Sequence, residues 1–217
     1  ELFRYKFKGS IVLLALGLGV FAVNAKGEDV ESVNFSVLGT WSALNNYTEY
    51  EVPLWETFLP EASDNQVDGT IVSMSEMGLS GFETMRLLKS GIFDFVHLTM
   101  GYATGDEPAM EGLDLASISQ DIDTARDIVD AYMPVINQRL EANHNLKILS
   151  AYPFTSQAFF CAKPIENIQD LSGLKIRTYS AALADFVEGA GGENVTVAFG
   201  EVAPALERGV IDCAISG

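Results

Sequence analysis

Short apolar runs and amphipathic segments alternate along most of this chain. Strands are expected where an apolar or alternating run of about four to eight residues lies between turn residues. These runs are 33–39, 67–74, 92–98, 146–151, 156–162, 174–178, 194–198 and 210–215. Helices are expected where apolar residues recur three or four positions apart, as at 48–62, 80–89, 121–142, 181–189 and 201–208. Because strands alternate with helices, the pattern predicts an α/β protein.

The segment 121–142 carries the clearest helical pattern. Asp121 or Asp123 is placed to cap its first turn. Pro134 lies inside the segment and is expected to kink it, because proline removes a backbone hydrogen bond.

The N-terminus has the order of a secretory signal peptide. Three basic residues within 4–8 precede an unbroken apolar run at 11–23, and small residues follow up to Ala25. The run is shorter than the ~20 residues that a membrane span needs. We therefore expect cleavage after Ala25, export, and a periplasmic location. The alternatives are a buried N-terminal helix or an uncleaved anchor.

Charge narrows the class of partner. The chain has 13 basic and 30 acidic residues and a net charge of −17. Such a surface repels nucleic acid and anionic lipid, so neither is an expected partner. Any cation that faces a cleft of so acidic a protein becomes a candidate for binding.

The two cysteines, Cys161 and Cys213, both fall in predicted strands. The oxidising surroundings of an exported protein allow one disulfide, and two buried free thiols are the alternative. The two histidines, His97 and His144, are distant in sequence and are expected to be structural or exposed. We expect no metal site and no cofactor.

The segment 169–178 (QDLSGLKIRT) places an arginine at the end of a strand. Side chains alternate along a strand, so Arg177 leaves it near its carboxyl end. In α/β proteins that end faces the ligand crevice, where a guanidinium can bind a carboxylate through two parallel hydrogen bonds. The alternative is a surface arginine paired with an acidic neighbour.

A second segment gives Arg177 a context. Residues 194–216 (NVTVAFGEVAPALERGVIDCAIS) predict a strand, a short helix and a turn into another strand. Together with DLSGLKIR, and with the glycine and aspartate pattern of 76–95, this order resembles the substrate-binding subunits of TRAP (tripartite ATP-independent periplasmic) transporters. The resemblance covers about 33–217.

The resemblance implies a two-lobed periplasmic binding protein-like fold of the type II-like kind. We expect a signal peptide at 1–25, the N-terminal part of lobe 1 at 26–154, and the N-terminal part of lobe 2 at 155–217. The chain stops in or just after the predicted buried strand 210–215, and we expect it to be truncated at its C-terminus.

The resemblance also implies a function without chemistry. Family members close on a small organic acid between their lobes and deliver it to the membrane permease subunits of the transporter. We expect a monomer in which Arg177 forms the main salt bridge to the ligand carboxylate. Gln157 stands where the family often has a second arginine, and Ser216 where it often has asparagine. Both departures argue against dicarboxylates and sialic acid.

Other ligand contacts are expected on loops that follow strands. The aromatic candidates have core packing as their alternative role, and the glutamate has simple solvation. These candidates are Trp41, Asn45, Glu76, Tyr102, Tyr179 and Phe199.

Two rival functions stay open at this point. One is a secreted α/β enzyme, such as a hydrolase, with catalytic residues beyond residue 217. Against it, the sequence has no Gly-x-Ser-x-Gly, His-Glu-x-x-His or phosphate-loop motif. The other is a ligand-binding receptor that serves a membrane sensor instead of a permease.

Overall fold

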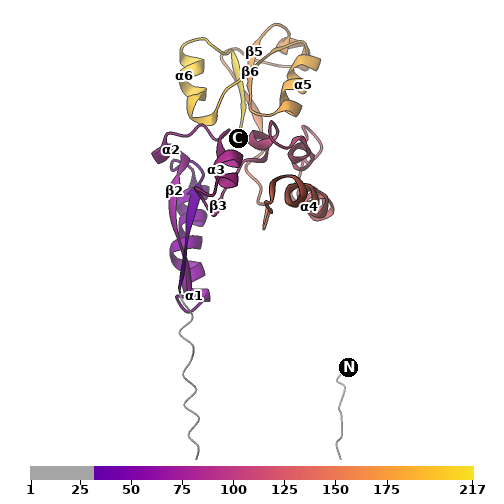
Figure 1. Ribbon diagram of the computed structural model, residues 1–217. Helices are drawn as coiled ribbons and strands as arrows, with labels where there is room; N and C mark the ends of the chain where they lie inside the picture. The colour runs from indigo at the N-terminus through magenta and orange to yellow at the C-terminus, as the bar shows by residue number, and fades with distance from the viewer. Residues whose placement is uncertain (1–31) are drawn as a thin grey trace, which may run out of the picture. The chain divides into compact units, whose positions relative to one another are not determined.

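The computed structural model describes residues 32–217 (Figure 1). The signal peptide predicted at 1–25 lies outside these residues. The described chain contains one sheet with strand order β2-β1-β3 and another with order β4-β7-β5-β6, each accompanied by helices. The predicted α/β class is therefore confirmed.

The first sheet is parallel throughout. It consists of β1 (Val33–Gly39), β2 (Val67–Ser73) and the short β3 (Phe95–Val96). The strand predicted at 92–98 is shorter than expected, because β3 pairs only with Val37 and Leu38 of β1.

A helical stretch between β1 and β2 covers one side of this sheet. It comprises two π-helical runs, η1 (Asn46–Glu51) and η2 (Leu54–Phe58), and then α1 (Leu59–Ala62). Tyr47 and Trp55 point from it into a cluster with strand residues of β1 and β2. The predicted helix at 48–62 is thus present.

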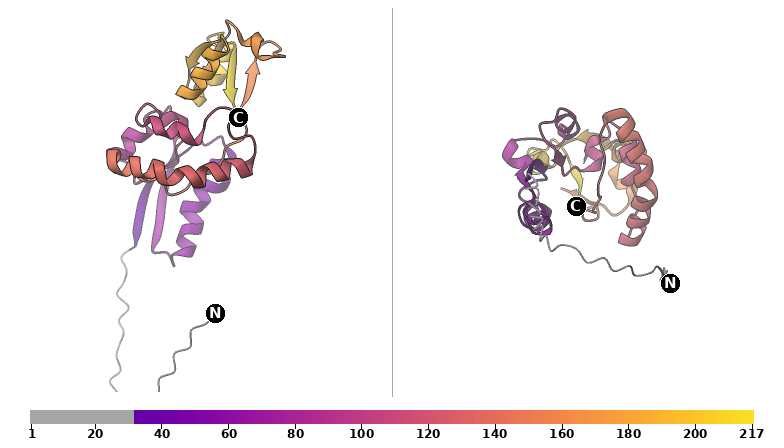
Figure 2. Two further views of the ribbon diagram at one scale, coloured as in Figure 1. Left: turned by 90° about the vertical axis from the view of Figure 1, so that its right-hand side faces the viewer. Right: turned by 60° about the horizontal axis from the view of Figure 1, so that its bottom comes forward.

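Short helices and one long helix follow. They are α2 (Met74–Met77), α3 (Thr84–Lys89), η3 (Met100–Ala103), η4 (Pro108–Leu113) and α4 (Ile122–His144). Figure 2 shows α4 running crosswise to the strands of the first sheet.

The start of α4 is capped as one of the two sequence alternatives predicts. The side chain of Asp121 accepts a hydrogen bond from the Thr124 amide. The helix continues without interruption past Pro134, and Asn145 in the left-handed conformation ends it.

The second sheet combines parallel and antiparallel pairing. It contains β4 (Ala158–Cys161), β5 (Lys175–Thr178), β6 (Glu193–Thr196) and β7 (Cys213–Ser216). β5 is parallel to β6 and β7, whereas β4 is antiparallel to β7. The accompanying helices are η5 (Ile168–Leu171), α5 (Ala181–Gly189), η6 (Phe199–Glu201) and α6 (Val202–Glu207).

Alternation along β7 assigns the two faces of this sheet. Cys213 and Ile215 join a core cluster that includes residues of α5, whereas Ala214 joins one that includes residues of α6. Arg177 is paired with Ala214 across the β5–β7 ladder, so it starts on the face of α6.

The strand predicted at 146–151 is wrong. The peptide groups of Ile148 bond to the side chain of Asn137 on α4, with N–H to Oδ1 at 2.7 Å and C=O from Nδ2 at 2.9 Å. A side-chain amide thus takes the place of a neighbouring strand.

Cys161 and Cys213 form a disulfide between the paired strands β4 and β7. From the sequence alone, a disulfide and two free thiols were both possible. In residues 32–217, no helix is long and apolar enough to cross a membrane.

Candidate functional site

Arg177 is buried, with 2% of its surface exposed, and its guanidinium bonds only to uncharged acceptors. Nε donates to the Val197 carbonyl at 2.8 Å and Nη1 to the Ile215 carbonyl at 2.6 Å. Nη2 donates to the hydroxyl of Tyr102 at 3.2 Å. The residue after β6, a residue of β7 and a residue of η3 therefore all bond to one cation.

No carboxylate of residues 32–217 forms an ion pair with this guanidinium. A guanidinium has five N–H groups, so three bonds leave one N–H free on each terminal nitrogen. Burial lowers the pKa of Arg177, and the neighbouring tyrosines oppose that shift. Because arginine stays protonated in proteins, the site holds a buried positive charge that suits an anion.

Tyr179 lies beside the cation, directly after the end of β5. Its ring centre is 4.8 Å from Arg177 Cζ, within the range of a cation–π contact. Its hydroxyl donates to Oδ2 of Asp114 at 3.4 Å. Burial and the Asp114 charge raise the pKa of Tyr179, so the phenol stays neutral.

Tyr102 connects the first part of the chain to this site. Its side chain is 5% exposed, and its hydroxyl accepts hydrogen bonds from Arg177 and from the Phe199 amide, the latter at 2.9 Å. Burial raises the pKa of Tyr102, although the nearby guanidinium opposes the shift. The hydroxyl therefore keeps its proton at neutral pH.

Aromatic rings enclose Tyr102. The ring centre of Trp41 is 5.7 Å from that of Tyr102 and 5.1 Å from that of Phe199. Phe82, which sequence reasoning assigned to an amphipathic helix, lies at 4.4 Å from the Tyr102 ring. Phe82 lies shortly before α3 and Tyr102 lies in η3, so no local sequence pattern predicts their contact.

Four predicted site residues thus contact Arg177 directly or through Tyr102. They are Trp41, Tyr102, Tyr179 and Phe199. Ser216 and Phe199 line an open hollow of about 320 Å³ together with residues of α6 and β4. Arg177 is not among the residues that line that hollow.

Three predicted site residues have other surroundings. Glu76 is exposed and closes a capping box at α2, where Oε2 accepts from the amide and the hydroxyl of Ser73 at 2.8 and 2.9 Å. The Ser73 bonds lower the pKa of Glu76. Asn45 is exposed before η1, and Gln157 is exposed with Nε2 at 3.3 Å from the Thr155 carbonyl.

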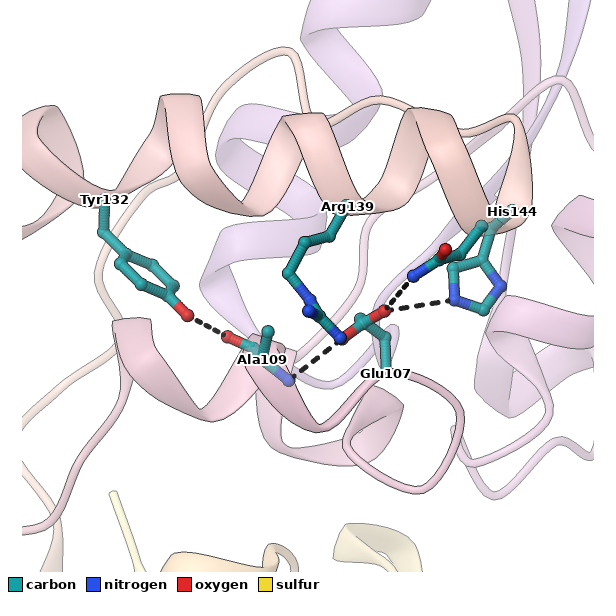
Figure 3. A network of polar contacts seen from close by, with 6 residues as sticks. Glu107, Ala109, Tyr132, Arg139 and His144 are labelled. Carbon is teal, nitrogen blue, oxygen red and sulfur yellow. Dashed lines mark hydrogen bonds and ion pairs between the residues drawn. The ribbon is translucent and has the colours of Figure 1, made fainter.

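A second buried charge, Glu107, gives a contrast because it is fully paired (Figure 3). Arg139 donates to Oε1 at 2.9 Å and Asn143 to Oε2 at 3.2 Å, while the imidazole of His144 lies 3.4 Å from Oε2. Glu107 thus has a cationic partner within the protein, whereas Arg177 forms no ion pair with a carboxylate of residues 32–217. Across the described part of the chain, no group of three His, Cys, Asp or Glu residues is placed to hold a metal ion.

Comparison with known proteins identifies relatives for nearly the whole described region. A model of the family described as "Bacterial extracellular solute-binding protein, family 7" (DctP) matches residues 38–216.

Two curated relatives are similar over part of their length. The ectoine-binding periplasmic protein TeaA of Halomonas elongata is 26% identical over 178 residues, which are 76% of this chain and 51% of that protein. A solute-binding protein of Chromohalobacter salexigens is 30% identical over 126 residues, 57% of this chain and 38% of that protein. The chain therefore spans about half of the length of the first relative and less than half of the second.

Solved structures show the same fold. An extracytoplasmic solute receptor of Bordetella pertussis that binds pyroglutamic acid matches with a TM-score of 0.77 at 20% identity, over 86% of this chain and 61% of that one. A TRAP periplasmic solute-binding protein of Sulfitobacter with bound β-D-galacturonate matches with a TM-score of 0.74 at 20% identity, over 85% and 62%. The predicted periplasmic binding protein-like fold is confirmed.

Proposed function

Since this chain belongs to the bacterial extracellular solute-binding protein family 7, we propose that it captures a small organic acid outside the cytoplasm and delivers it to a TRAP-type membrane permease. The family consists of solute-binding proteins, which agrees with the prediction of binding without catalysis. The ligand, the permease and periplasmic export are parts of this proposal.

The single observation that carries the proposal is the buried guanidinium of Arg177. Its charge has no carboxylate partner in residues 32–217, and each terminal nitrogen keeps one free N–H. Leaving a buried charge unpaired costs several kcal/mol, whereas each hydrogen bond between charged groups contributes about 1.5–3 kcal/mol. A ligand carboxylate would supply both the charge and the two acceptors.

The surroundings of Arg177 favour a ring-shaped acid. The Tyr179 ring lies against the cation, and Trp41 packs on the rings of Tyr102 and Phe199. The names of similar proteins include ectoine, pyroglutamic acid, β-D-galacturonate and orotic acid. Each of these compounds is a small ring that bears one carboxylate, and we propose a ligand of that kind here.

Capture would proceed by closure of two lobes, 26–154 and 155–217. Tyr102 belongs to the first of these segments, and Arg177 and Phe199 belong to the second. A ligand bound between them would contribute contacts that exist only in the closed state. Two charge-assisted bonds are enough to shift an open–closed balance of a few kcal/mol.

Calorimetry on the full-length protein tests the proposal. Pyroglutamate, galacturonate and ectoine serve as ligands for the wild type and for Arg177→Ala, and the variant is expected to lose at least about 100-fold in affinity for any acid that binds. Arg208→Ala is the matched control, because Arg208 is exposed and bonds only to the Pro204 carbonyl. Circular dichroism checks that both variants fold. Equal affinity of Arg177→Ala and the wild type contradicts the proposal.

A further inference from the structure

The hydroxyl of Tyr102 is buried, and its proton is not donated to any residue of the described chain. Both of its hydrogen bonds are bonds in which it accepts, from Nη2 of Arg177 at 3.2 Å and from the Phe199 amide at 2.9 Å. A phenol can accept two bonds and donate one. Since the side chain is 5% exposed, its proton has no acceptor among residues 32–217 and little access to water.

This arrangement cannot be relieved by rotating the hydroxyl. A guanidinium and a backbone amide are donors only, so neither can receive the proton of Tyr102. A buried donor without an acceptor costs about as much as a lost hydrogen bond, and such groups are rare in folded proteins. The oxygen of the hydroxyl serves Arg177 and Phe199, which a phenylalanine could not do, but its proton still calls for an acceptor of its own.

Building on the proposed function, we propose that Tyr102 is a second donor to the ligand carboxylate and acts together with Arg177. Tyr102 Oη is already bonded to Arg177 Nη2. A carboxylate oxygen that accepts the other N–H of Nη2 therefore lies next to Tyr102 Oη. The hydroxyl proton then completes a set of three donors around one carboxylate. The neutral hydroxyl of Tyr102 would thus supply a hydrogen bond that a second arginine could otherwise donate to the carboxylate.

The ring of Tyr102 is held in place for this role. Its centre is 4.4 Å from that of Phe82 and 5.7 Å from those of Trp41 and Tyr179. Gly81 allows the close approach, since a Cβ at that position would lie 2.5 Å from Tyr102 Cδ2. A donor that is fixed before binding loses little conformational freedom when the ligand arrives.

The donor set also predicts which ligands bind. Both oxygens of a carboxylate accept hydrogen bonds, so they can satisfy the two free N–H groups of Arg177 and the hydroxyl of Tyr102. In a carboxamide one oxygen is replaced by an NH2 group, which is itself a donor and cannot accept from any of them. With one cation and one phenol, the site fits a single carboxylate and offers no second charge for a dicarboxylate.

The decisive variant is Tyr102→Phe in the full-length protein, which keeps the ring and removes the hydroxyl. We expect its affinity for whichever of pyroglutamate, galacturonate and ectoine binds the wild type to fall by about 10- to 100-fold. The preference for the carboxylate over its carboxamide is expected to shrink as well, which a purely structural role would not produce. Tyr132→Phe is the matched control, since it loses a hydroxyl bond of 3.0 Å to the Ala109 carbonyl away from Arg177.

The outcomes separate this inference from the function on which it rests. If Tyr102→Phe binds as tightly as the wild type while Arg177→Ala does not bind, only the role of Tyr102 is refuted. If the wild type binds none of the acids, the proposed function fails and this inference fails with it. Should Tyr102→Phe not fold, a ring-fluorinated tyrosine at position 102 replaces it. Its more acidic hydroxyl is a stronger donor, so affinity rises if the inference holds and stays unchanged if it does not.

Discussion

Tyr152 donates a hydrogen bond of 2.8 Å to Oε1 of Glu51, a carboxylate that lies 101 residues earlier in the chain. Glu51 is 2% exposed, and Thr40 supplies its other donors, the amide at 2.8 Å and the hydroxyl at 2.7 Å. Tyr152 lies in the irregular segment between α4 and β4. The buried carboxylate therefore fastens that segment to the end of β1.

His97 fixes the direction of this bond. Trp55 can only donate, so Nε2 of His97 accepts its proton at 2.9 Å and the neutral imidazole carries its own proton on Nδ1. Nδ1 lies 3.4 Å from the hydroxyl of Tyr152, whose proton is then directed to Glu51. Burial lowers the pKa of His97, although the Glu51 charge opposes that shift, so the imidazole is neutral at neutral pH.

Removing the hydroxyl in Tyr152→Phe is expected to destabilise the fold. Glu51 would lose one donor while remaining buried, and Tyr152 is 45% exposed, so water replaces part of the bond. We expect the free energy of unfolding to fall by about 1 kcal/mol in urea denaturation. Tyr50→Phe is the control, because Tyr50 is 66% exposed, and its effect should stay within about 0.5 kcal/mol. Equal stability of the two variants would refute the role of the Glu51 bond.

Glu107 predicts an acid-dependent loss of stability. Burial disfavours its charge, but bonds from Arg139, Asn143 and the Ala109 amide outweigh burial and lower the pKa of Glu107 to about 2. The folded pKa is below the ordinary value of 4.5, so the paired carboxylate stabilises the fold fully above that pH. This contribution is lost as the pH falls from about 4.5 toward about 2.

Glu107→Gln should therefore flatten the dependence of unfolding free energy on pH in this acidic range. Urea denaturation at a series of pH values measures the slope. Glu141→Gln is the control, since Glu141 is 56% exposed and its pair with Lys147 at 3.3 Å lies at the surface. An unchanged slope in Glu107→Gln would show that the carboxylate is not responsible.

The local sequence pattern was sufficient to predict the position of Arg177 on its strand, but not the residues that contact it. Alternation along β5 and the turn before it placed the arginine at the carboxyl end of a strand, where the structure has it. The bond from Arg177 to Tyr102 joins residues 75 positions apart, and no periodicity encodes such a contact. The loop origin of Tyr102 made it a candidate, but its role as a buried acceptor required the fold.

The failed strand at 146–151 has a similar cause. Its apolar pattern fits a strand, yet a strand needs a neighbour for its peptide groups. Asn137, on a helix that was itself predicted, satisfies the N–H and C=O of Ile148 instead. Glu76, predicted as a ligand contact, has its carboxylate bonded to Ser73 within its own helical turn, an interaction that sequence pattern also did not predict.

Gly81→Ala is expected to disturb the site through Tyr102. Gly81 has φ of +106°, and an added Cβ would lie 2.5 Å from Tyr102 Cδ2 and 3.4 Å from Trp41 Cζ2. Backbone strain and the displaced ring together should lower the free energy of unfolding by about 2 kcal/mol or more, measured by urea denaturation. Gly105→Ala is the control, because no atom lies within 4 Å of its Cβ position and its effect should stay within about 0.5 kcal/mol. If Gly81→Ala were as stable as Gly105→Ala, the ring of Tyr102 would be free to move, and the fixed geometry argued for its hydroxyl would be wrong.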